Sequence, residues 1–364
     1  MAIPEETIWE AKPHTLAKHD ILKRYLQAWF PIIDSWSNSL IYLDGFCGPG
    51  RYEGGEPGSP IIALSEAVNH SRKLTGNVVF LFSDTDFDRI ENLKKEIKQI
   101  DVPINYDVIP LHCSFEECLD TLLSGIRVIS QPPTFALIDP FGFKGIPFSI
   151  IEKLMKRKSC ECLITFMVDS MNRWLKLDQA EIAKHIQLAF GIDEGIPIDL
   201  NNTSNRVIAL RDAYYARLGT IARYIRHFEM RDDHGRIIYY LFFISNHQTG
   251  FKKMKEAMWK VEPRGSFRFS DSTNPQQNVL FSDEDSWLPI LLKEISNQFS
   301  GRKGIDTSDV QIFIEDETAF CTPHMKKALT ELENKDMIVV EPIKVNGKKR
   351  HGKTFPEGVI INFN

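Results

Sequence analysis

Short acidic and glycine-rich segments follow several apolar runs of this chain, and their residue types suit contact with a nucleotide. The first run, 39–44, ends in DGFCGPG, which contains Asp44, Gly48 and Gly50. Glycine allows a tight turn and a close approach of backbone N–H groups to a ligand, while Asp44 could orient this loop or take up an amine. The second run ends at Asp84, whose carboxylate is suited to accept hydrogen bonds from both hydroxyls of a ribose.

Two further run ends carry residues of the same kind. The third ends in HCSF, where Ser114 and Phe115 could flank a base, and the fourth in DPFG, where Asp139 is followed by a free carbonyl. Each segment alone is more often a plain turn or a helix start, and Asp with Gly three residues later is typical of a β-turn. Their occurrence at four successive run ends favours a nucleotide lying across a sheet.

Strand and helix patterns alternate along the first part of the chain. Strands are predicted at 39–44, 77–84, 104–115, 134–138 and 161–168, and helices at 58–70, 87–99, 115–126 and 148–158. The first helix begins near His14, and Pro31 marks its end. A helical insertion near 170–220 precedes two long strands within 222–246. This order predicts an α/β fold with a doubly wound, Rossmann-like sheet, and the four run ends are expected to meet at the carboxyl ends of its strands.

A second domain is predicted at the C-terminus. Apolar periodicity fails across 271–284, which we interpret as a linker between a first domain at 1–270 and a second at 285–364. Three helical patterns, at 286–299, 306–316 and 322–336, precede two strands at 337–345 and 354–363. Three helices followed by a hairpin is the order of a winged helix-turn-helix.

The predicted hairpin has a basic tip. It carries Lys348, Lys349, Arg350, His351 and Lys353. Such a tip suits a phosphate backbone, but a winged helix that docks a protein fits the pattern equally well. The preceding helix at 322–336 offers few Arg, Asn or Gln side chains of the kind that read bases.

Composition narrows the class of protein further. The chain has 364 residues, of which 43% are hydrophobic and 26% charged, as in ordinary globular proteins. Its net charge of -5 requires any nucleic-acid surface to be a local patch. The six cysteines form no CxxC pair, which argues against a zinc ribbon or a disulfide framework, so no metal site is predicted. No run approaches the roughly 18 apolar residues of a membrane span. We therefore expect a cytoplasmic protein with no membrane partner.

Two motifs resemble those of a known enzyme class. DGFCGPG resembles the D-P-F-C-G-S-G loop of class I S-adenosylmethionine-dependent amino-methyltransferases that act on DNA and RNA bases, and DPFG resembles their D-P-P-Y motif. Over nearly its full length the chain resembles the three-Cys-motif partner (TcmP) family, through KHDILKRYLQAWF, YLDGFCGPGRY with GSP, LIDPFGFKG, FKKMKEAMWKV, GSFRF and the terminal winged helix. That family is methyltransferase-like and is named for a radical-type iron–sulfur partner encoded nearby.

The resemblance implies a set of site residues. S-adenosylmethionine would be bound by Asp44, Gly45, Phe46, Gly48, Gly50, Asp84, Ser114 and Phe115. Asp139 and the Pro140 carbonyl would accept hydrogen bonds from an exocyclic amine, and Phe141 or Phe143 would stack on the extruded base. Two positions depart from the usual patterns. Phe46 replaces the first glycine of D-x-G-x-G-x-G, as in the amino-methyltransferase variant, and Phe141 replaces the second proline of D-P-P-Y.

Three functions stay open at this point. The first is methyl transfer to a nitrogen of a nucleic-acid base, in DNA or RNA. The second is a non-catalytic scaffold for an iron–sulfur partner, which the missing proline favours slightly, and the third is a winged-helix DNA-binding protein. Among weaker candidates, Arg173 could hold a substrate phosphate or form a surface ion pair. Lys18 and His19 lie on the first helix, which often covers the cofactor in the enzymes that the chain resembles, but we expect them on its solvated face. The segment 51–57 is expected to be a mobile cover.

Overall fold

The computed structural model divides the chain into two compact units. It describes residues 6–125, 131–140, 142, 146–175, 180–195, 198, 205–263, 266–272 and 287–364. Unit 1 comprises Met1–Val261 and Arg268–Asn274, and unit 2 comprises Glu262–Phe267 and Pro275–Asn364. Most of the predicted linker at 271–284 lies outside the described residues.

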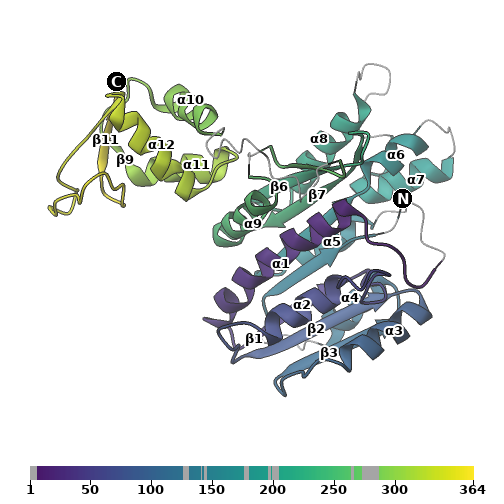
Figure 1. Cartoon of the computed structure of the whole chain (residues 1–364). Coiled ribbons are helices and arrows are strands. Elements are labelled where there is room, and N and C mark those ends of the chain that lie inside the picture. The colour runs from purple at the N-terminus through teal and green to yellow at the C-terminus, as the bar shows by residue number, and fades with distance from the viewer. Residues whose placement is uncertain are drawn as a thin grey trace. The chain divides into compact units, whose positions relative to one another are not determined.

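Unit 1 is built on an eight-stranded mixed sheet with the order β3-β2-β1-β4-β5-β7-β6-β8 (Figure 1). The strands are β1 (Ser39–Asp44), β2 (Asn77–Asp84), β3 (Tyr106–His112), β4 (Thr134–Ile138), β5 (Cys160–Phe166), β6 (Tyr224–Arg231), β7 (Ile237–Ser245) and β8 (Arg268–Ser270). The first five are mutually parallel, and β7 runs antiparallel between β5 and β6. The predicted α/β class with a mainly parallel sheet is confirmed, while β8 is an addition that the sequence did not indicate.

Helices cover both faces of this sheet. They are α1 (Pro13–Asp34), α2 (Ser59–Val68), α3 (Phe87–Ile97), α4 (Phe115–Gly125), α5 (Phe148–Met155), α6 (Val168–Trp174), α7 (Ala180–Phe190), α8 (Arg206–Leu218) and α9 (Gln248–Val261). On one face of the sheet, Ile41 and Leu43 of β1 belong to a hydrophobic cluster that also contains residues of α4, α5, α7 and α8. On the other face Tyr42 stacks on Phe135, against which Tyr25 and Trp29 of α1 also pack. Helix α1 lies alongside α9 on that face (Figure 1).

Helix α1 does not end at Pro31, contrary to the prediction. It continues to Asp34 with Pro31 inside its last turn. A proline at this position lacks the N–H that would bond the carbonyl of Gln27. That carbonyl instead accepts a hydrogen bond from Nε2 of His70 at 3.0 Å. An external donor thus replaces the missing bond and lets the helix run on.

The strand order creates a topological switch point in unit 1. Strand β1 pairs with β2 on one side and with β4 on the other. Strand β3 lies beyond β2 and strand β5 beyond β4, so the strand order reverses at β1. In such sheets the crevice outside the carboxyl ends of the two central strands is the usual ligand site. Here that crevice lies between Asp44, the last residue of β1, and Asp139, which follows β4.

Unit 2 contains three helices and a small sheet. These are α10 (Leu288–Phe299), α11 (Thr307–Glu317) and α12 (Thr322–Asn334), with β9 (Ile305–Asp306), β10 (Ile338–Val340) and β11 (Ile360–Phe363). The sheet order is β10-β11-β9, and both pairings are antiparallel. The two predicted strands are therefore much shorter than expected, and a third short strand, β9, completes the sheet.

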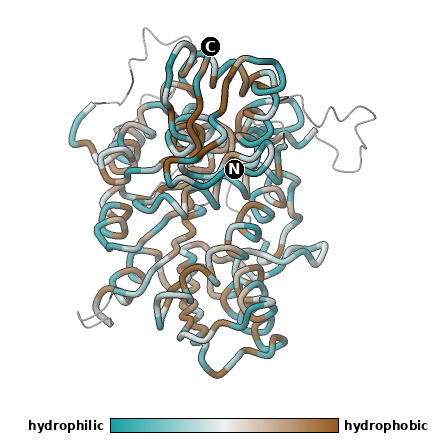
Figure 2. The backbone as a smooth tube through the Cα atoms, turned by 90° about the vertical axis from the view of Figure 1, so that its left-hand side faces the viewer, coloured by the Kyte–Doolittle hydropathy of each residue, from teal (hydrophilic) through white to brown (hydrophobic). Residues whose placement is uncertain are grey.

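Hydropathy alternates along the chain (Figure 2), with hydrophobic and hydrophilic residues interchanging along the helical coils. This is the pattern of helices that bury one face only. Among the described residues, no helix combines the length and the apolar character that crossing a membrane would require. All six cysteines are free thiols.

Candidate functional site

The loop after β1 is fixed by hydrogen bonds to two strand ends. Oδ1 of Asp44 accepts the N–H of Phe46 at 3.2 Å, and Oδ2 of Asp84 accepts the N–H of Gly48 at 3.1 Å. Gly48 and Gly50 have φ values of +64° and +91°, in the region that favours glycine. Of the two roles considered for Asp44, the structure shows the first, orientation of the loop.

Asp84 is buried and acts on the protein backbone. Besides Gly48, it accepts the N–H of Asp86 at 2.9 Å through Oδ1, and Nη1 of Arg89 lies 4.0 Å from the same oxygen. Burial raises the pKa of Asp84, against the lowering effects of the Asp86 amide and Arg89. Each carboxylate oxygen has two acceptor positions, so capacity remains for the ribose hydroxyls that the sequence predicts.

Ser114 and Phe115 begin helix α4. Ser114 donates its N–H and its hydroxyl to Oε2 of Glu117 at 2.8 and 2.7 Å, and the Glu117 N–H donates back to the Ser114 hydroxyl at 3.3 Å. This reciprocal arrangement is a capping box. The ring of Phe115 is buried, and a Cβ at Gly45 would lie 2.3 Å from it. Gly45 therefore allows α4 to pack directly under the loop.

Asp139 forms an ion pair with Lys18 of α1, which the sequence did not predict. Lys18 is only 6% exposed, whereas about a quarter of the Asp139 side chain (24%) is accessible. Burial opposes the charge on Asp139, but the Lys18 ammonium outweighs it and lowers the pKa of this carboxyl. Asp139 is thus ionised at neutral pH and still reachable from the cleft.

The expectation that Lys18 and His19 lie on a solvated face is wrong, because both are buried. Burial, and then the charge of Lys18, lower the pKa of His19 to about 3, so its ring is neutral. Nδ1 of His19 has no hydrogen-bond partner among the described residues. Helical periodicity missed both residues, because a lysine is read as solvated unless its countercharge is known, and Asp139 is 121 residues away.

These groups surround a cleft with about 330 Å³ of empty space. Its walls are the loop residues 46–52, Gly58, Ser59, Asp139, His19 and Trp9. Tyr52 forms a cover with two of them, its ring centroid lying 5.7 Å from that of Trp9 and 5.6 Å from that of His19. The segment 51–57 closes on itself through a bridge between Arg51 and Pro57, and Arg51 also contacts Glu96 at 2.7 Å.

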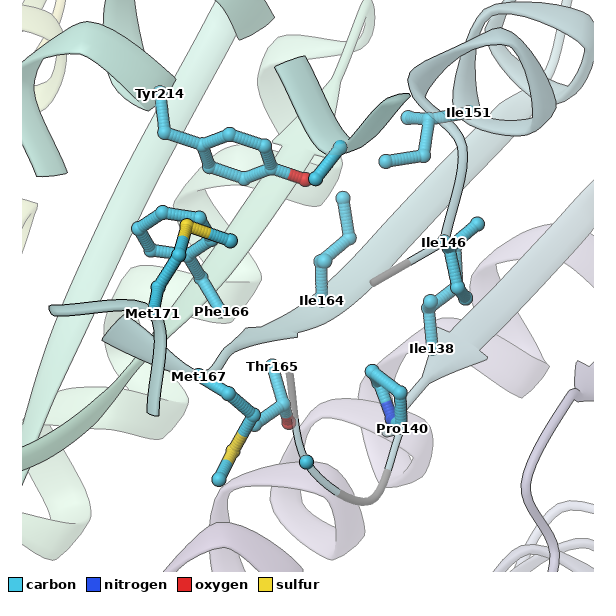
Figure 3. A pocket seen from close by; sticks show the side chains of 12 residues that line it. Ile138, Pro140, Ile146, Ile151, Ile164, Thr165, Phe166, Met167, Met171 and Tyr214 are labelled. Carbon is cyan, nitrogen blue, oxygen red and sulfur yellow. The ribbon is translucent and has the colours of Figure 1, made fainter. Parts of the chain in front are cut away.

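A second, apolar pocket adjoins the end of β4 (Figure 3). It has about 370 Å³ of empty space and is lined by Pro140, Gly142, Ile146 and Thr165 among others. Figure 3 shows Tyr214 on one side of it and Pro140 on the other. The Tyr214 ring stacks on Phe166 at 4.2 Å, which gives the pocket a rigid aromatic wall. Phe141 and Phe143 lie outside the described residues.

The structure brings most of the predicted site residues of unit 1 together. Asp44, Gly45, Phe46, Gly48, Gly50, Asp84, Phe115 and Asp139 all belong to the loop, its supports or its cleft. Two polar atoms there are buried without a hydrogen-bond partner among the described residues: the carboxylate oxygen Oδ2 of Asp44 and the imidazole nitrogen Nδ1 of His19. Buried polar atoms are rarely left unpaired, and His19 lines the cleft, so its Nδ1 is available to a ligand there. The sequence missed Trp9, included Tyr52 only as part of the predicted cover at 51–57, and assigned Lys18 and His19 to a solvated face of α1.

Three of the other predicted contact residues, Arg173, Arg350 and Lys353, have protein partners. Arg173 forms an ion pair with Asp169 at 3.2 Å. Arg350 binds Glu333 of α12 through both terminal nitrogens at 2.8 Å, and Nζ of Lys353 contacts Asn334. Lys348 and Lys349 are exposed. Within the described residues, no group of three or more His, Cys, Asp and Glu side chains could hold a metal ion.

Comparisons with known proteins give no family assignment. No family model and no curated protein matches the chain. Among solved structures, protein LPL1258 from Legionella pneumophila str. Philadelphia 1 is 14% identical, with 68% of this chain and 92% of that chain covered and a TM-score of 0.41. A DUF574 family protein from Streptomyces avermitilis is 10% identical, with 64% and 84% covered and a TM-score of 0.34. The cyclopropane synthase MmaA2 from Mycobacterium tuberculosis is 14% identical, with 68% and 70% covered and a TM-score of 0.29. Likenesses this weak carry no functional argument.

Proposed function

We propose that the chain is an S-adenosylmethionine-dependent methyltransferase. One observation carries this proposal: a loop of left-handed glycines at the switch point is fixed to the ends of β1 and β2 and faces Asp139 across a cleft. Ligands of doubly wound sheets bind at such switch points. The resemblance of DGFCGPG and DPFG to methyltransferase motifs favours S-adenosylmethionine as the ligand.

The residues present fit this cofactor. When bound, S-adenosylmethionine supplies an electrophilic methyl group. Gly48 and Gly50 allow the loop backbone to approach the ligand, and Asp84 retains acceptor capacity for ribose hydroxyls. His19 is neutral, so it offers a hydrogen-bonding nitrogen without repelling a cationic ligand. Trp9 and Tyr52 exclude water from this side of the cleft.

We further propose that the methyl acceptor is a nitrogen of a nucleic-acid base. Asp139 is ionised and partly accessible, so it can accept a hydrogen bond from an exocyclic amine and stabilise the positive charge that develops there. In this proposal the extruded base stacks against Pro140 and the apolar side chains beside it. Unit 2, with three helices and a three-stranded sheet, acts in this proposal as a winged helix that holds the nucleic acid.

A second function is favoured by the Lys18 contact. Because Lys18 already neutralises Asp139, an incoming amine must share or displace it. A scaffold that binds the cofactor but transfers no methyl group would retain this ion pair undisturbed. In that case the chain serves a three-Cys-motif iron–sulfur partner, as the family resemblance implies.

Calorimetry with S-adenosylmethionine tests the cofactor site. Gly48→Ala places a side chain where φ is +64°, and we expect at least a tenfold loss of affinity. Gly235→Ala is the matched control, because Gly235 has a φ of +76° in the β6–β7 turn with open space around it. Equal affinities for the two variants, or no binding to the wild type, would refute the proposal.

Transfer of labelled methyl groups to mixed cellular DNA and RNA then separates the two functions. We expect transfer with the wild type and loss of transfer with Asp139→Asn, while cofactor affinity changes by less than about threefold. Tight cofactor binding without any transfer by the wild type would support the scaffold instead.

A further inference from the structure

A separate pocket lies at the other end of the parallel strands, near the first residues of β5. It contains about 1000 Å³ of empty space, including the part that opens to solvent, compared with about 330 Å³ for the cleft at the switch point. Its walls come from the second half of α1, the start of β5 and the first turns of α9. Trp29 lies eleven residues beyond Lys18, or roughly 16 Å along the α1 axis. The proposed methyltransferase site does not use this pocket.

Glu161 lines the floor of this pocket. The residue is 5% exposed, and its carboxylate accepts hydrogen bonds from the Tyr25 hydroxyl at 2.6 Å and the Ser245 hydroxyl at 2.7 Å. Both donors are neutral, and no Lys, Arg or His of the described chain lies within ion-pair distance of Glu161. Burial raises the pKa of Glu161, against the lowering effects of these two hydroxyls, of His247 and of the Trp29 side chain. A buried carboxylate without a countercharge is costly, and it has acceptor positions left over.

The backbone of α9 is adapted to this carboxylate. A Cβ at Gly250 would lie 1.7 Å from Oε1 of Glu161, so only glycine lets the first turn of α9 pack here. The basic side chains that line the pocket bond other groups: Nζ of Lys253 binds Glu256 at 2.7 Å, and Nε2 of His247 donates to the Lys158 carbonyl at 3.0 Å. The carboxylate is therefore kept at the pocket floor and is not neutralised from the rim.

The walls of the pocket are aromatic. Trp29 is buried on one side, whereas Trp36, just after α1, is 59% exposed. Indole faces attract organic cations as well as apolar groups, and a carboxylate adds a charge-assisted hydrogen bond to an ammonium. An anion would be repelled by Glu161.

We propose that this pocket binds a small organic ammonium ion, with its charged group at Glu161 and its apolar body against Trp29 and Trp36. The ligand class is an amine carried on an aromatic or aliphatic group. Binding would supply the countercharge that Glu161 lacks in the protein alone.

Three probes of similar shape test the proposal on the full chain: phenethylamine, neutral 2-phenylethanol and anionic 3-phenylpropionate. Each is titrated by calorimetry and by tryptophan fluorescence. We expect phenethylamine to bind at least tenfold more tightly than 2-phenylethanol, and 3-phenylpropionate not to bind. Equal affinities, or no binding by any probe, would overturn the proposal. Affinity for S-adenosylmethionine is measured in parallel and reports on the other site alone.

Variants identify the groups responsible. Glu161→Gln should abolish the preference for the amine and leave the affinity for 2-phenylethanol within about twofold. Glu256→Gln, which removes a carboxylate of α9 that does not line the pocket, should keep the preference. Trp36→Ala changes an exposed side chain and so tests the site even where Glu161→Gln does not fold. We expect it to weaken binding of phenethylamine at least fivefold, and unchanged binding would count against the proposal.

Discussion

At the scale of single residues, the site contains two buried carboxyl groups, Asp139 and Asp44, whose surroundings stabilise the charged form to different degrees. Asp139 has the Lys18 ammonium as an ion-pair partner, whereas the fully buried Asp44 accepts the Phe46 amide and has no ion pair among the described residues. Neutral donors compensate burial less well than a full countercharge. Burial therefore raises the pKa of Asp44 to about 7, while the pKa of Asp139 is lowered.

Asp44 should make the stability of the protein depend on pH. Between pH 4 and 7 the unfolded chain releases the Asp44 proton while the folded protein retains it, so ionisation favours unfolding as pH rises. Asp44→Asn removes this term. We expect the free energy of unfolding of the variant, relative to wild type, to increase by on the order of 2 kcal/mol from pH 5 to pH 8. Urea titrations at both pH values measure it, and a difference that stays constant with pH would contradict the raised pKa.

At the scale of elements, the end of β1 and the start of α4 form one packed unit. Gly45 and Phe115 are in contact so close that a Cβ at position 45 would lie 2.3 Å from the ring. A forced methyl group in a packed site typically costs about 1–3 kcal/mol. The loop and α4 therefore depend on each other through this contact.

A double-mutant cycle tests this dependence. Gly45→Ala should destabilise the wild type by about 2 kcal/mol but should cost much less in a Phe115→Ala background, where the ring is absent. Denaturant unfolding of the four proteins gives the coupling energy. A cost of Gly45→Ala that is the same in both backgrounds would show that the ring is not what excludes a side chain.

The sequence predicted the central strands well, for a physical reason. Strands buried on both faces leave continuous apolar runs, so 39–44 and 77–84 were predicted with the bounds that β1 and β2 have. The face of α1 was harder to predict. Leu16 stands at an apolar position of the helical spacing but is 39% exposed, while Lys18 is buried. Helical spacing cannot reveal a countercharge that arrives from a distant strand end, and the external donor His70 that allows α1 to pass Pro31 is equally invisible to it.

At the scale of the whole molecule, the net charge is negative, so any surface that binds nucleic acid must be a local basic patch. Net charge is -5, so attraction to a phosphate backbone depends on patches such as the hairpin of unit 2. Arg350 is engaged with Glu333 and shapes that hairpin, whereas Lys348 and Lys349 are exposed. Exposed apolar side chains also lie in this region, including Val345 at 73% and Ile343 at 57%. These support the alternative of a protein partner.

Salt dependence decides between the two kinds of partner. Each lysine that contacts a phosphate of duplex DNA contributes about 0.9 to the slope of log affinity against log salt concentration. If the hairpin tracks DNA, the double variant Lys348→Gln with Lys349→Gln should reduce that slope by about 2 and weaken binding across unrelated sequences. Lys95→Gln with Lys98→Gln makes the same change in net charge at the end of α3 in unit 1 and should leave the slope unchanged. Identical slopes for both double variants would mean that the hairpin does not contact phosphates, and its exposed Ile343 and Val345 would then point to a protein as the partner of unit 2.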